Sequence, residues 1–413
     1  MKINKWTLGL AAVGLVSLTP GMRADDKAPA PVPVTTALSA TTISGYVDTS
    51  AVWNPGTGNA HPAPYSFNAG KQDGFNVDMV DLKVAKPMDE SQWAAGYVLE
   101  LMYGPDANAV DSSSQPIRQA YVSLRTPVGN GIDWQIGQWD NLLGYESTDS
   151  YKNPNWTRSY GYTLEPTEHV GVLATYKVND VVSAQVGVAD SVTTIGGNGA
   201  PAFGNARGSA IESKKGVVSL LSLTAPDSFG DWKGSALYVG ADYGPGLAFD
   251  KAGPGGHQVD KTHLYVGATI NTPVKDLTLG AAWDSVNNMD TGAVEGAAMT
   301  VAGYVSYKIT DKITSNARAE YAHGSAFDNL LASDPTRPNG GVGINGAGPQ
   351  EAKVFALTET IQYDLWANVI SRLEVRWDSS ADGSPHFGAT NPTTGGPTKN
   401  NEITVAANVL YKF

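Results

Sequence analysis

Apolar and polar side chains alternate along most of the chain after residue 42, and this alternation predicts the fold. In residues 369–378, one face carries Val369, Leu373, Val375 and Trp377, and the other carries Arg372, Glu374, Arg376 and Asp378. A period of two is typical of a β-strand whose two faces meet different surroundings. We find no convincing helical period in this part of the sequence, which therefore predicts an all-β protein.

The alternation recurs in about sixteen segments. We expect strands near 42–53, 74–87, 92–103, 116–126, 131–139, 168–178, 181–191, 214–225, 232–243, 261–272, 276–287, 296–309, 312–324, 352–364, 367–379 and 402–413. Most of these segments have about ten to fourteen residues, the length that a tilted strand needs to cross a bilayer. The pattern predicts a transmembrane, antiparallel up-and-down β-barrel over residues 41–413.

The connections between these segments alternate in length. Every second one is short: 87–91, 127–130, 179–180, 226–231, 273–275, 310–311 and 365–366. The others are mostly long and rich in Gly, Pro, Asn and Ser, as in 54–72, 141–167, 192–213, 244–260, 326–350 and 380–401. Short periplasmic turns on one rim and long extracellular loops on the other are typical of a bacterial barrel. A β-sandwich has no reason to sort its loops in this way.

Aromatic residues fall near both ends of the expected strands. The short-turn rim would carry Trp93, Trp232, Tyr307, Tyr363, Trp366, Tyr411 and Phe413, and the long-loop rim Trp53, Tyr103, Tyr243, Tyr321 and Trp377. Such girdles are typical of the two membrane–water interfaces. We interpret the terminal Tyr411 and Phe413 as the membrane-insertion signal, which implies outer-membrane lipid and the barrel-assembly machinery as partners.

The N-terminus has the features of a secretory signal peptide. Lys2 and Lys5 precede an apolar run over residues 6–18, and an imperfect cleavage site follows at 22–24. The run is too short to span a bilayer. We expect residues 1–24 to be a signal peptide and 25–40 a proline-rich periplasmic linker. The expected location is the outer membrane of a Gram-negative bacterium.

Charge and composition exclude several classes of function. The formal net charge is −12, and it becomes −15 when Lys2, Lys5 and Arg23 leave with the signal peptide. This acidity argues against a nucleic-acid partner. The absence of cysteine excludes disulfides, thiolate metal sites and thiol nucleophiles. The six histidines come without a Gly-x-Ser-x-Gly motif or a third metal ligand, so we expect no enzymatic activity, catalytic residue, cofactor or metal.

Two blocks of the sequence resemble a known family. The first block comprises QIGQWDNLLGYE at 135–146, NPNWTRSYGY at 153–162 and PTEHVG at 166–171, and the second is SRLEVRWDSS at 371–380. Both are similar to the OmpL-like β-barrel porin family (porin-2), and the resemblance covers most of the mature chain. It implies an outer-membrane barrel that conducts solutes, and says little about which solutes.

Charged residues on the expected strands should face the lumen, because an arginine or lysine that faces lipid at mid-depth costs about 2–4 kcal/mol. On this argument the pore-lining residues are Asp48, Glu100, Arg125, Arg318, Glu320, Arg372, Glu374, Arg376 and Asp378. They could set an ion preference, or they could pair across neighbouring strands and keep the wall rigid. Both roles can hold together.

The connection 141–167 is the candidate for a loop that narrows the pore. Its candidate residues are Tyr145, Glu146, Asp149, Arg158 and Tyr160. A barrel of about sixteen strands is wide enough for an inward-folded loop, in which Glu146 and Asp149 would face the arginines of the wall. The alternative is a surface loop that its own aromatic residues close over.

These features predict an outer-membrane porin that allows small hydrophilic solutes and ions to diffuse through a water-filled lumen. Net acidity favours cations, although arginines on the lining could reverse this preference locally. Two alternatives stay open: a structural or adhesive barrel whose long external loops bind a partner, and a soluble extracellular β-protein. A homo-oligomer is possible by analogy with general porins of this size.

Overall fold

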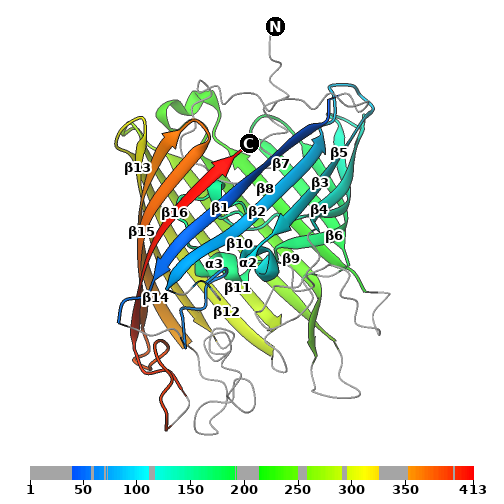
Figure 1. Cartoon of the computed structure of the whole chain (residues 1–413). Coiled ribbons are helices and arrows are strands. Elements are labelled where there is room, and N and C mark those ends of the chain that lie inside the picture. Colours follow the sequence, from blue (N-terminus) through cyan, green and yellow to red (C-terminus); the bar gives the residue numbers. More distant parts are fainter. Residues whose placement is uncertain are drawn as a thin grey trace.

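The protein folds as a closed barrel in which each strand pairs with its neighbours in sequence. The computed structural model describes residues 40–56, 60–68, 71, 73–110, 117–190, 192, 214–249, 258–290, 295–324, 352–393 and 396–413. Within these residues, sixteen antiparallel strands follow one another around the barrel, and β1 closes it by pairing with β16 (Figure 1). The expected signal peptide and the expected linker up to residue 39 lie outside the described residues.

The strands have the following bounds: β1 Thr42–Trp53, β2 Gly74–Lys86, β3 Ala94–Tyr103, β4 Ile117–Thr126, β5 Ile132–Asp140, β6 Glu168–Lys177, β7 Val182–Ala189, β8 Gly216–Thr224, β9 Ala236–Phe249, β10 Gln258–Asn271, β11 Leu277–Asp290, β12 Glu295–Lys308, β13 Ile313–Gly324, β14 Ala352–Trp366, β15 Val369–Ser380 and β16 Asn401–Lys412. The predicted all-β antiparallel barrel is therefore confirmed, and so is the strand count. The C-terminus lies at the rim of short turns, where Gly45 and Phe413 exchange backbone hydrogen bonds of 3.0 Å.

β9 differs most from its predicted bounds of 232–243. The short 3-10 helix η2 (Asp227–Trp232) occupies the expected start, and the strand continues past Pro245. Proline is tolerated there because the pairing of β9 with β8 ends at Tyr243, and among the described strands β10 alone pairs with the extension. A residue without a backbone N–H fits a strand that lacks one neighbour.

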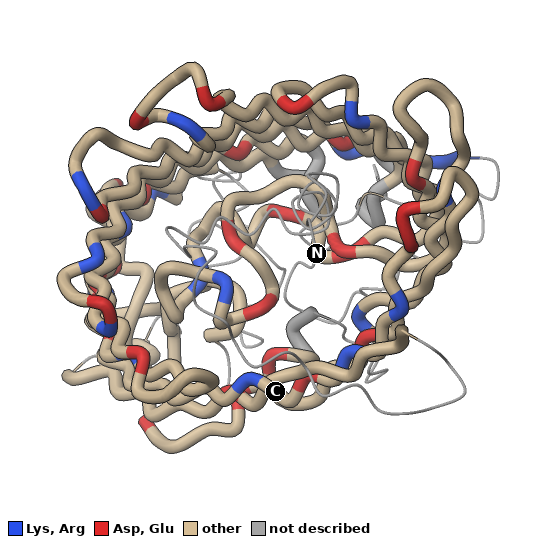
Figure 2. Tube along the Cα trace, turned by 90° about the horizontal axis from the view of Figure 1, so that it is seen from above, with Lys and Arg blue, Asp and Glu red and all other residues tan. Residues whose placement is uncertain are grey.

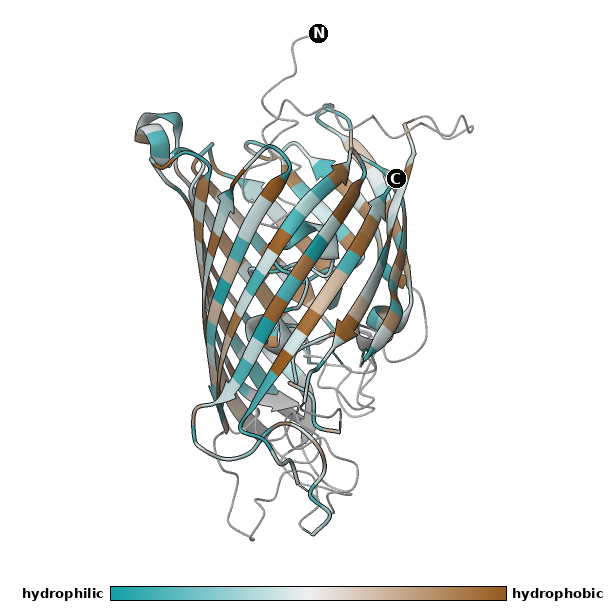
Figure 3. Ribbon diagram, turned by 60° about the vertical axis from the view of Figure 1, so that its left-hand side comes forward, coloured by the Kyte–Doolittle hydropathy of each residue, from teal (hydrophilic) through white to brown (hydrophobic). Residues whose placement is uncertain are grey.

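The two faces of the wall have opposite character. On β15, the outward side chains of Leu373 and Val375 are 57% and 47% exposed, whereas Arg376 and Asp378 are 0% exposed. Hydrophobic and hydrophilic residues alternate along the other strands as well (Figure 3). The apolar face is therefore the one that meets hydrocarbon, and the polar face encloses the interior.

Parts of the long connections lie inside the barrel. These parts include the helices α2 (Pro105–Val110) and α3 (Tyr160–Leu164) (Figure 1). The 3-10 helix η1 (Ser150–Lys152) belongs to the same connection as α3. A view along the barrel axis shows chain segments crossing the space within the wall (Figure 2). In the described part of the chain, no helix has the length and apolar character that a membrane crossing requires.

Candidate functional site

The connection between β5 and β6, residues 141–167, lies inside the barrel and packs against its wall. Tyr160 and Leu164 of α3 are fully buried, and they belong to an apolar cluster with Val286 on β11 and Ala356 on β14. We call residues 141–167 the inner loop. Its position places all five predicted loop residues in contact with the wall or with one another.

Glu374 on β15 is the central attachment point of the inner loop. Its carboxylate accepts hydrogen bonds from the backbone N–H of Trp156 at 2.6 Å and from the backbone N–H of Thr157 at 3.0 Å. The hydroxyl of Thr157 donates a further bond of 2.5 Å, and that of Thr360 on β14 one of 2.6 Å. Four donors thus satisfy a carboxylate that is 1% exposed.

Two arginines extend this attachment. Arg318 on β13 donates to Glu146 at 2.9 Å and to the carbonyl oxygen of Thr157 at 2.7 Å. Arg376 on β15 donates to the carbonyl oxygen of Arg158 at 2.6 Å. Arginine suits this task because its five donors lie in one plane and reach several acceptors together. The expected pairing of Glu146 with an arginine of the wall is therefore present.

Acidic residues of the wall bind the start of α3. Glu320 accepts a hydrogen bond of 2.7 Å from the backbone N–H of Tyr160, and Asp378 accepts one of 2.7 Å from the Tyr160 hydroxyl. Arg376 also lies over the aromatic ring of Tyr65 from an earlier connection, 3.9 Å from its centre. Arg372 donates to the carbonyl oxygen of Ser150 at 3.1 Å. All six predicted charges of β13 and β15 therefore hold or flank the inner loop.

A second charged cluster ties the inner loop to β2–β5. The guanidinium of Arg118 on β4 lies between Glu100 at 2.5 Å, Asp140 at 2.6 Å and Asp149 of the inner loop. Lys83 lies 2.8 Å from Glu100. Burial raises the pKa of Asp149, but Arg118 and Lys152 outweigh this effect and hold that pKa well below its usual range. Asp149 therefore faces an arginine as expected, although one that the sequence reasoning missed.

Arg118 was missed because strict alternation assigns it to the outer face with Val122 and Leu124. The pairing of β3 with β4 shifts between Glu100 and Leu101, so Arg118 is an extra residue that turns inward together with Gln119. Such a bulge re-aims one side chain of a strand. The sequence did contain one indication of this bulge, because strict alternation would place the charged Arg118 on the lipid-facing side.

The remaining predicted residues occupy separate places. Asp48 on β1 accepts a hydrogen bond of 2.6 Å from Asn408 on β16. Arg125 pairs with Asp133 at 2.6 Å, next to the short turn between β4 and β5 and outside both clusters. In the inner loop, Tyr145 stacks on Tyr304 with ring centres 4.0 Å apart. The guanidinium of Arg158 donates within the loop itself, to the carbonyl oxygens of Trp156 and Thr148, at 2.9 and 2.8 Å.

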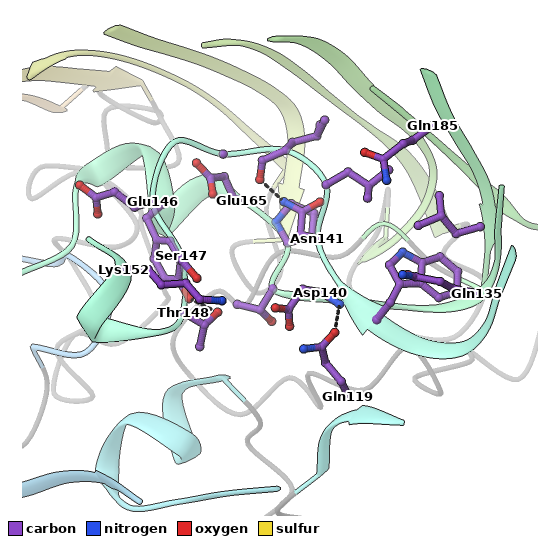
Figure 4. Close-up of a pocket in the computed structure, with 18 of the residues that line it drawn as sticks. Gln119, Gln135, Asp140, Asn141, Glu146, Ser147, Thr148, Lys152, Glu165 and Gln185 are labelled. Carbon is purple, nitrogen blue, oxygen red and sulfur yellow. Dashed lines mark hydrogen bonds between the residues drawn. The ribbon is translucent and has the colours of Figure 1, made fainter. Parts of the chain in front are cut away.

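A polar cavity of about 90 Å³ lies between the inner loop and the wall of β4–β7 (Figure 4). Its lining includes Gln119, Asp140, Glu146, Lys152, Glu165 and Gln185. A water molecule takes about 30 Å³ in the liquid, so a space of this size and polarity suits a few waters. The cavity therefore has room for water beside the loop and is smaller than a pocket for a drug-sized ligand.

Three carboxylates have the spacing of a cation site. Oxygen atoms of Asp81, Glu100 and Asp149 lie within 4.8 Å of one another, an arrangement that a hard cation such as Ca²⁺ could use. Arg118 already contacts Glu100 and Asp149. A guanidinium at that place opposes a second positive charge, and the cluster is best described as an ion-pair network.

Comparisons with known proteins agree with the closed sixteen-strand barrel described above. The family described as "Putative beta-barrel porin-2, OmpL-like" matches residues 40–413. OmpF of Salmonella typhi is 14% identical, with 90% of this chain and 97% of that chain covered and a TM-score of 0.55. The anion-selective porin of Comamonas acidovorans is 14% identical, with coverage of 90% and 99% and a TM-score of 0.54. The channel DcaP of Acinetobacter baumannii is 13% identical, with coverage of 90% and 97% and a TM-score of 0.52. No curated relative matches the sequence.

With sequence identities of 13–14%, the solved structures establish only the fold. The function is inferred from the match to the family. The match extends over the whole described barrel, from before β1 to Phe413. The expectations of an outer-membrane location and of a porin are therefore confirmed. The chain belongs to the OmpL-like β-barrel porin-2 family, and it is a bacterial outer-membrane channel for the passive diffusion of small hydrophilic solutes and ions.

Proposed function

We propose that the inner loop sets the width of the water-filled lumen in this porin. The observation that carries the proposal is the set of hydrogen bonds from the backbone of residues 156–160 to Glu374 and Glu320. Backbone groups bonded to buried carboxylates fix the path of a loop more firmly than flexible side chains at its surface would. A loop held in this way reduces the open cross-section permanently.

Under this proposal, the predicted pore-lining charges of β13 and β15 serve to hold the inner loop in place. Glu320, Glu374, Arg318 and Arg376 are at most 2% exposed, so they act on permeating solutes through the loop that they hold. Groups that keep partial contact with water would act directly. Lys83 and Asp140, with side chains 32% and 33% exposed, are the leading candidates of this kind. The direct pore-lining role of Asp48, Glu100 and Arg125 stays a prediction.

The test is the single-channel conductance of a variant that lacks residues 151–159. We expect conductance to rise, because the deletion removes the backbone donors of Trp156 and Thr157 along with the segment that crosses the lumen. The variant must first show the heat-dependent migration in SDS of a folded barrel. A folded variant with the conductance of the wild type would refute the proposal.

We further propose an oligomeric state, a lack of enzymatic activity and a route of export and insertion for this porin. A Vibrio cholerae OmpT structure with a TM-score of 0.53 to this chain is described as a trimer form, which supports self-association here. The porin family supports a channel without enzymatic activity, and this stays a prediction. We also propose export through a signal peptide at 1–24, a periplasmic linker at 25–40, and insertion by the barrel-assembly machinery, with Tyr411 and Phe413 as the signal.

A further inference from the structure

One carboxylate points out of the barrel at the middle of a strand. Glu359 is the eighth of the fifteen residues of β14, and it shares the outer face with Leu357 and Ile361. Among the strand residues whose burial the structure describes, Glu359 is the only charged side chain that is exposed. Its place at mid-strand puts it near the middle of the hydrocarbon layer.

Acyl chains alone are an unfavourable environment for this carboxylate. The hydroxyl of Ser315 on β13 donates a hydrogen bond of 2.6 Å to Oε1 of Glu359. An ionised carboxylate offers about four acceptor sites, and acyl chains supply no donor for the others. Charges on the lipid face also destabilise outer-membrane barrels most at mid-depth. A ligand that brings both N–H donors and a positive charge would remove this penalty.

Glu359 lines a hollow in the outer wall. The hollow has a volume of about 680 Å³, and three small residues, Gly303, Ala317 and Ala319, belong to its lining. Gly303 on β12 lies opposite Ala319 on β13, and Ala317 lies opposite Glu359. A Cβ atom added to Gly303 would meet no atom within 4 Å. The small residues therefore leave room for a molecule beside the carboxylate.

Larger apolar side chains border these small residues on both sides. They are Leu279 and Val305 on β11 and β12, and Leu357, Val375 and Trp377 on β14 and β15. Arg318 also belongs to the lining, but its side chain is buried towards the lumen, so Glu359 is the charge that the hollow presents. Small-molecule sites are commonly hollows of about 300–1,000 Å³ with apolar walls and a few polar groups. We call this hollow with its carboxylate the Glu359 site.

We propose that the Glu359 site binds a membrane-dissolved amphiphile with an apolar body and a protonated amine. The apolar body lies over Gly303 and Ala319, and the ammonium group meets the carboxylate of Glu359. An ammonium supplies three donors, and its attraction to a carboxylate is strong where the dielectric constant is low. A neutral amphiphile leaves the charge unpaired, and an anionic one is repelled. The inference depends on the barrel lying in a membrane and is independent of the width of its lumen.

Trp377 provides an optical test, because it lines the hollow and bromine quenches indole fluorescence on contact. The probes are a bromoalkylamine and the bromoalkanol of the same chain length, added to the protein in phosphatidylcholine vesicles. The signal is the part of the fluorescence that Trp377→Phe removes. We expect the amine to bind at least roughly tenfold more tightly than the alkanol, and Glu359→Gln to abolish this ratio. A ratio that Glu359→Gln leaves unchanged would overturn the proposal.

The wild-type protein allows a second test that needs no substitution. An alkylamine with a terminal diazirine group is irradiated with the protein in the same vesicles, and the labelled peptides are identified by mass spectrometry. We expect labels on β12–β15, which excess unlabelled alkylamine suppresses and the alkanol does not. Gly303→Leu, which fills the hollow, should abolish these labels, and Gly303→Ala should keep most of them. Equal labelling of all walls of the barrel, or labels that Gly303→Leu leaves unchanged, would contradict the proposal.

Discussion

Glu374 holds Thr157 at two points with one carboxylate oxygen. The Oε1 atom accepts hydrogen bonds from the backbone nitrogen of Thr157 at 3.0 Å and from its Oγ1 atom at 2.5 Å. The two residues are 217 positions apart in the sequence, so this contact is one of those that join the inner loop to a strand far from it in the chain. The buried carboxylate accepts hydrogen bonds from the loop backbone, as a neighbouring strand accepts them from the backbone of a strand.

Replacing Glu374 with alanine should release the loop. The change leaves the backbone N–H groups of Trp156 and Thr157 without their acceptor, and an unsatisfied buried donor costs about 1–3 kcal/mol. We expect larger and noisier single-channel currents, together with faster hydrogen exchange at residues 155–160. Glu374→Gln keeps one acceptor oxygen and should have an intermediate effect.

The matched control for this experiment is Glu359→Gln. It alters a glutamate of the neighbouring strand that points away from the lumen, so the current through one barrel should stay unchanged. If Glu374→Ala conducts like the wild type while its loop amides exchange faster, the loop does not limit conductance. If neither property changes, Glu374 does not anchor the loop.

Arg118 should contribute far more to barrel stability than Arg125. Removing Arg118 leaves Glu100, Asp140 and Asp149 as close negative charges, and breaking a buried ion pair costs about 3–5 kcal/mol. The pair of Arg125 with Asp133 is partly exposed at the rim, where such pairs contribute about 0–1 kcal/mol. The temperature at which the barrel unfolds in SDS should therefore fall clearly for Arg118→Ala and little for Arg125→Ala. Equal shifts would contradict the central role of Arg118.

Gly280 on β11 makes room for the inner loop. A Cβ atom at this position would lie 1.9 Å from the hydroxyl oxygen of Tyr145. Tyr145 is 4% exposed and stacked on Tyr304, so it has little room to move aside. We expect Gly280→Ala to displace the start of the loop and to destabilise the barrel by about 1–3 kcal/mol. Gly303→Ala on the outer face is the matched control, and an equal loss of stability in both variants would argue against this contact.

Strand positions were predictable because they depend on local alternation and on the need to keep charges out of lipid. The pattern in residues 369–378 determines both the strand and which face turns inward. The bulge at Arg118 breaks that pattern, and its inward direction depends on the pairing of two strands, which alternation within one strand does not contain. The extension of β9 through Pro245 likewise depends on where β8 ends.

The path of the inner loop was predictable only in part. The charge of Glu146 indicated an arginine partner on the wall, and Arg318 is that partner. The contacts of Glu374 with the backbone of Trp156 and Thr157 carry no such signal, because every residue has a backbone N–H. The sequence therefore indicates which buried side chains need hydrogen-bonding or charged partners. Only the three-dimensional path of the loop shows which backbone groups serve as those partners.

The ion preference should be for cations. The polar cavity beside the loop is lined by three carboxylates and by one cationic side chain, Lys152. Glu146 is neutralised by buried Arg318, whereas the side chain of Asp140, although paired with Arg118, is 33% exposed and can act on ions in the lumen. We expect a salt gradient across a bilayer to give a reversal potential of the cation-selective sign, and Asp140→Asn to weaken it. The change in permeability ratio should be at most about fivefold, since one unit charge contributes about 1 kcal/mol at 4 Å in water. A wild-type protein that selects anions would contradict this prediction, but it would still be a channel.

The docking of the inner loop on the wall is tested most directly by a pair of introduced cysteines. Asn155 donates from Nδ2 to Oγ1 of Thr360 on β14 at 2.7 Å, and both residues are fully buried. In the otherwise cysteine-free chain, Asn155→Cys with Thr360→Cys should be joined by a short bifunctional thiol reagent, with conductance kept at the wild-type value. Asn155→Cys with Gln185→Cys on β7 should not be joined. Two free thiols in the first pair, both labelled by a membrane-impermeant maleimide, would contradict the account.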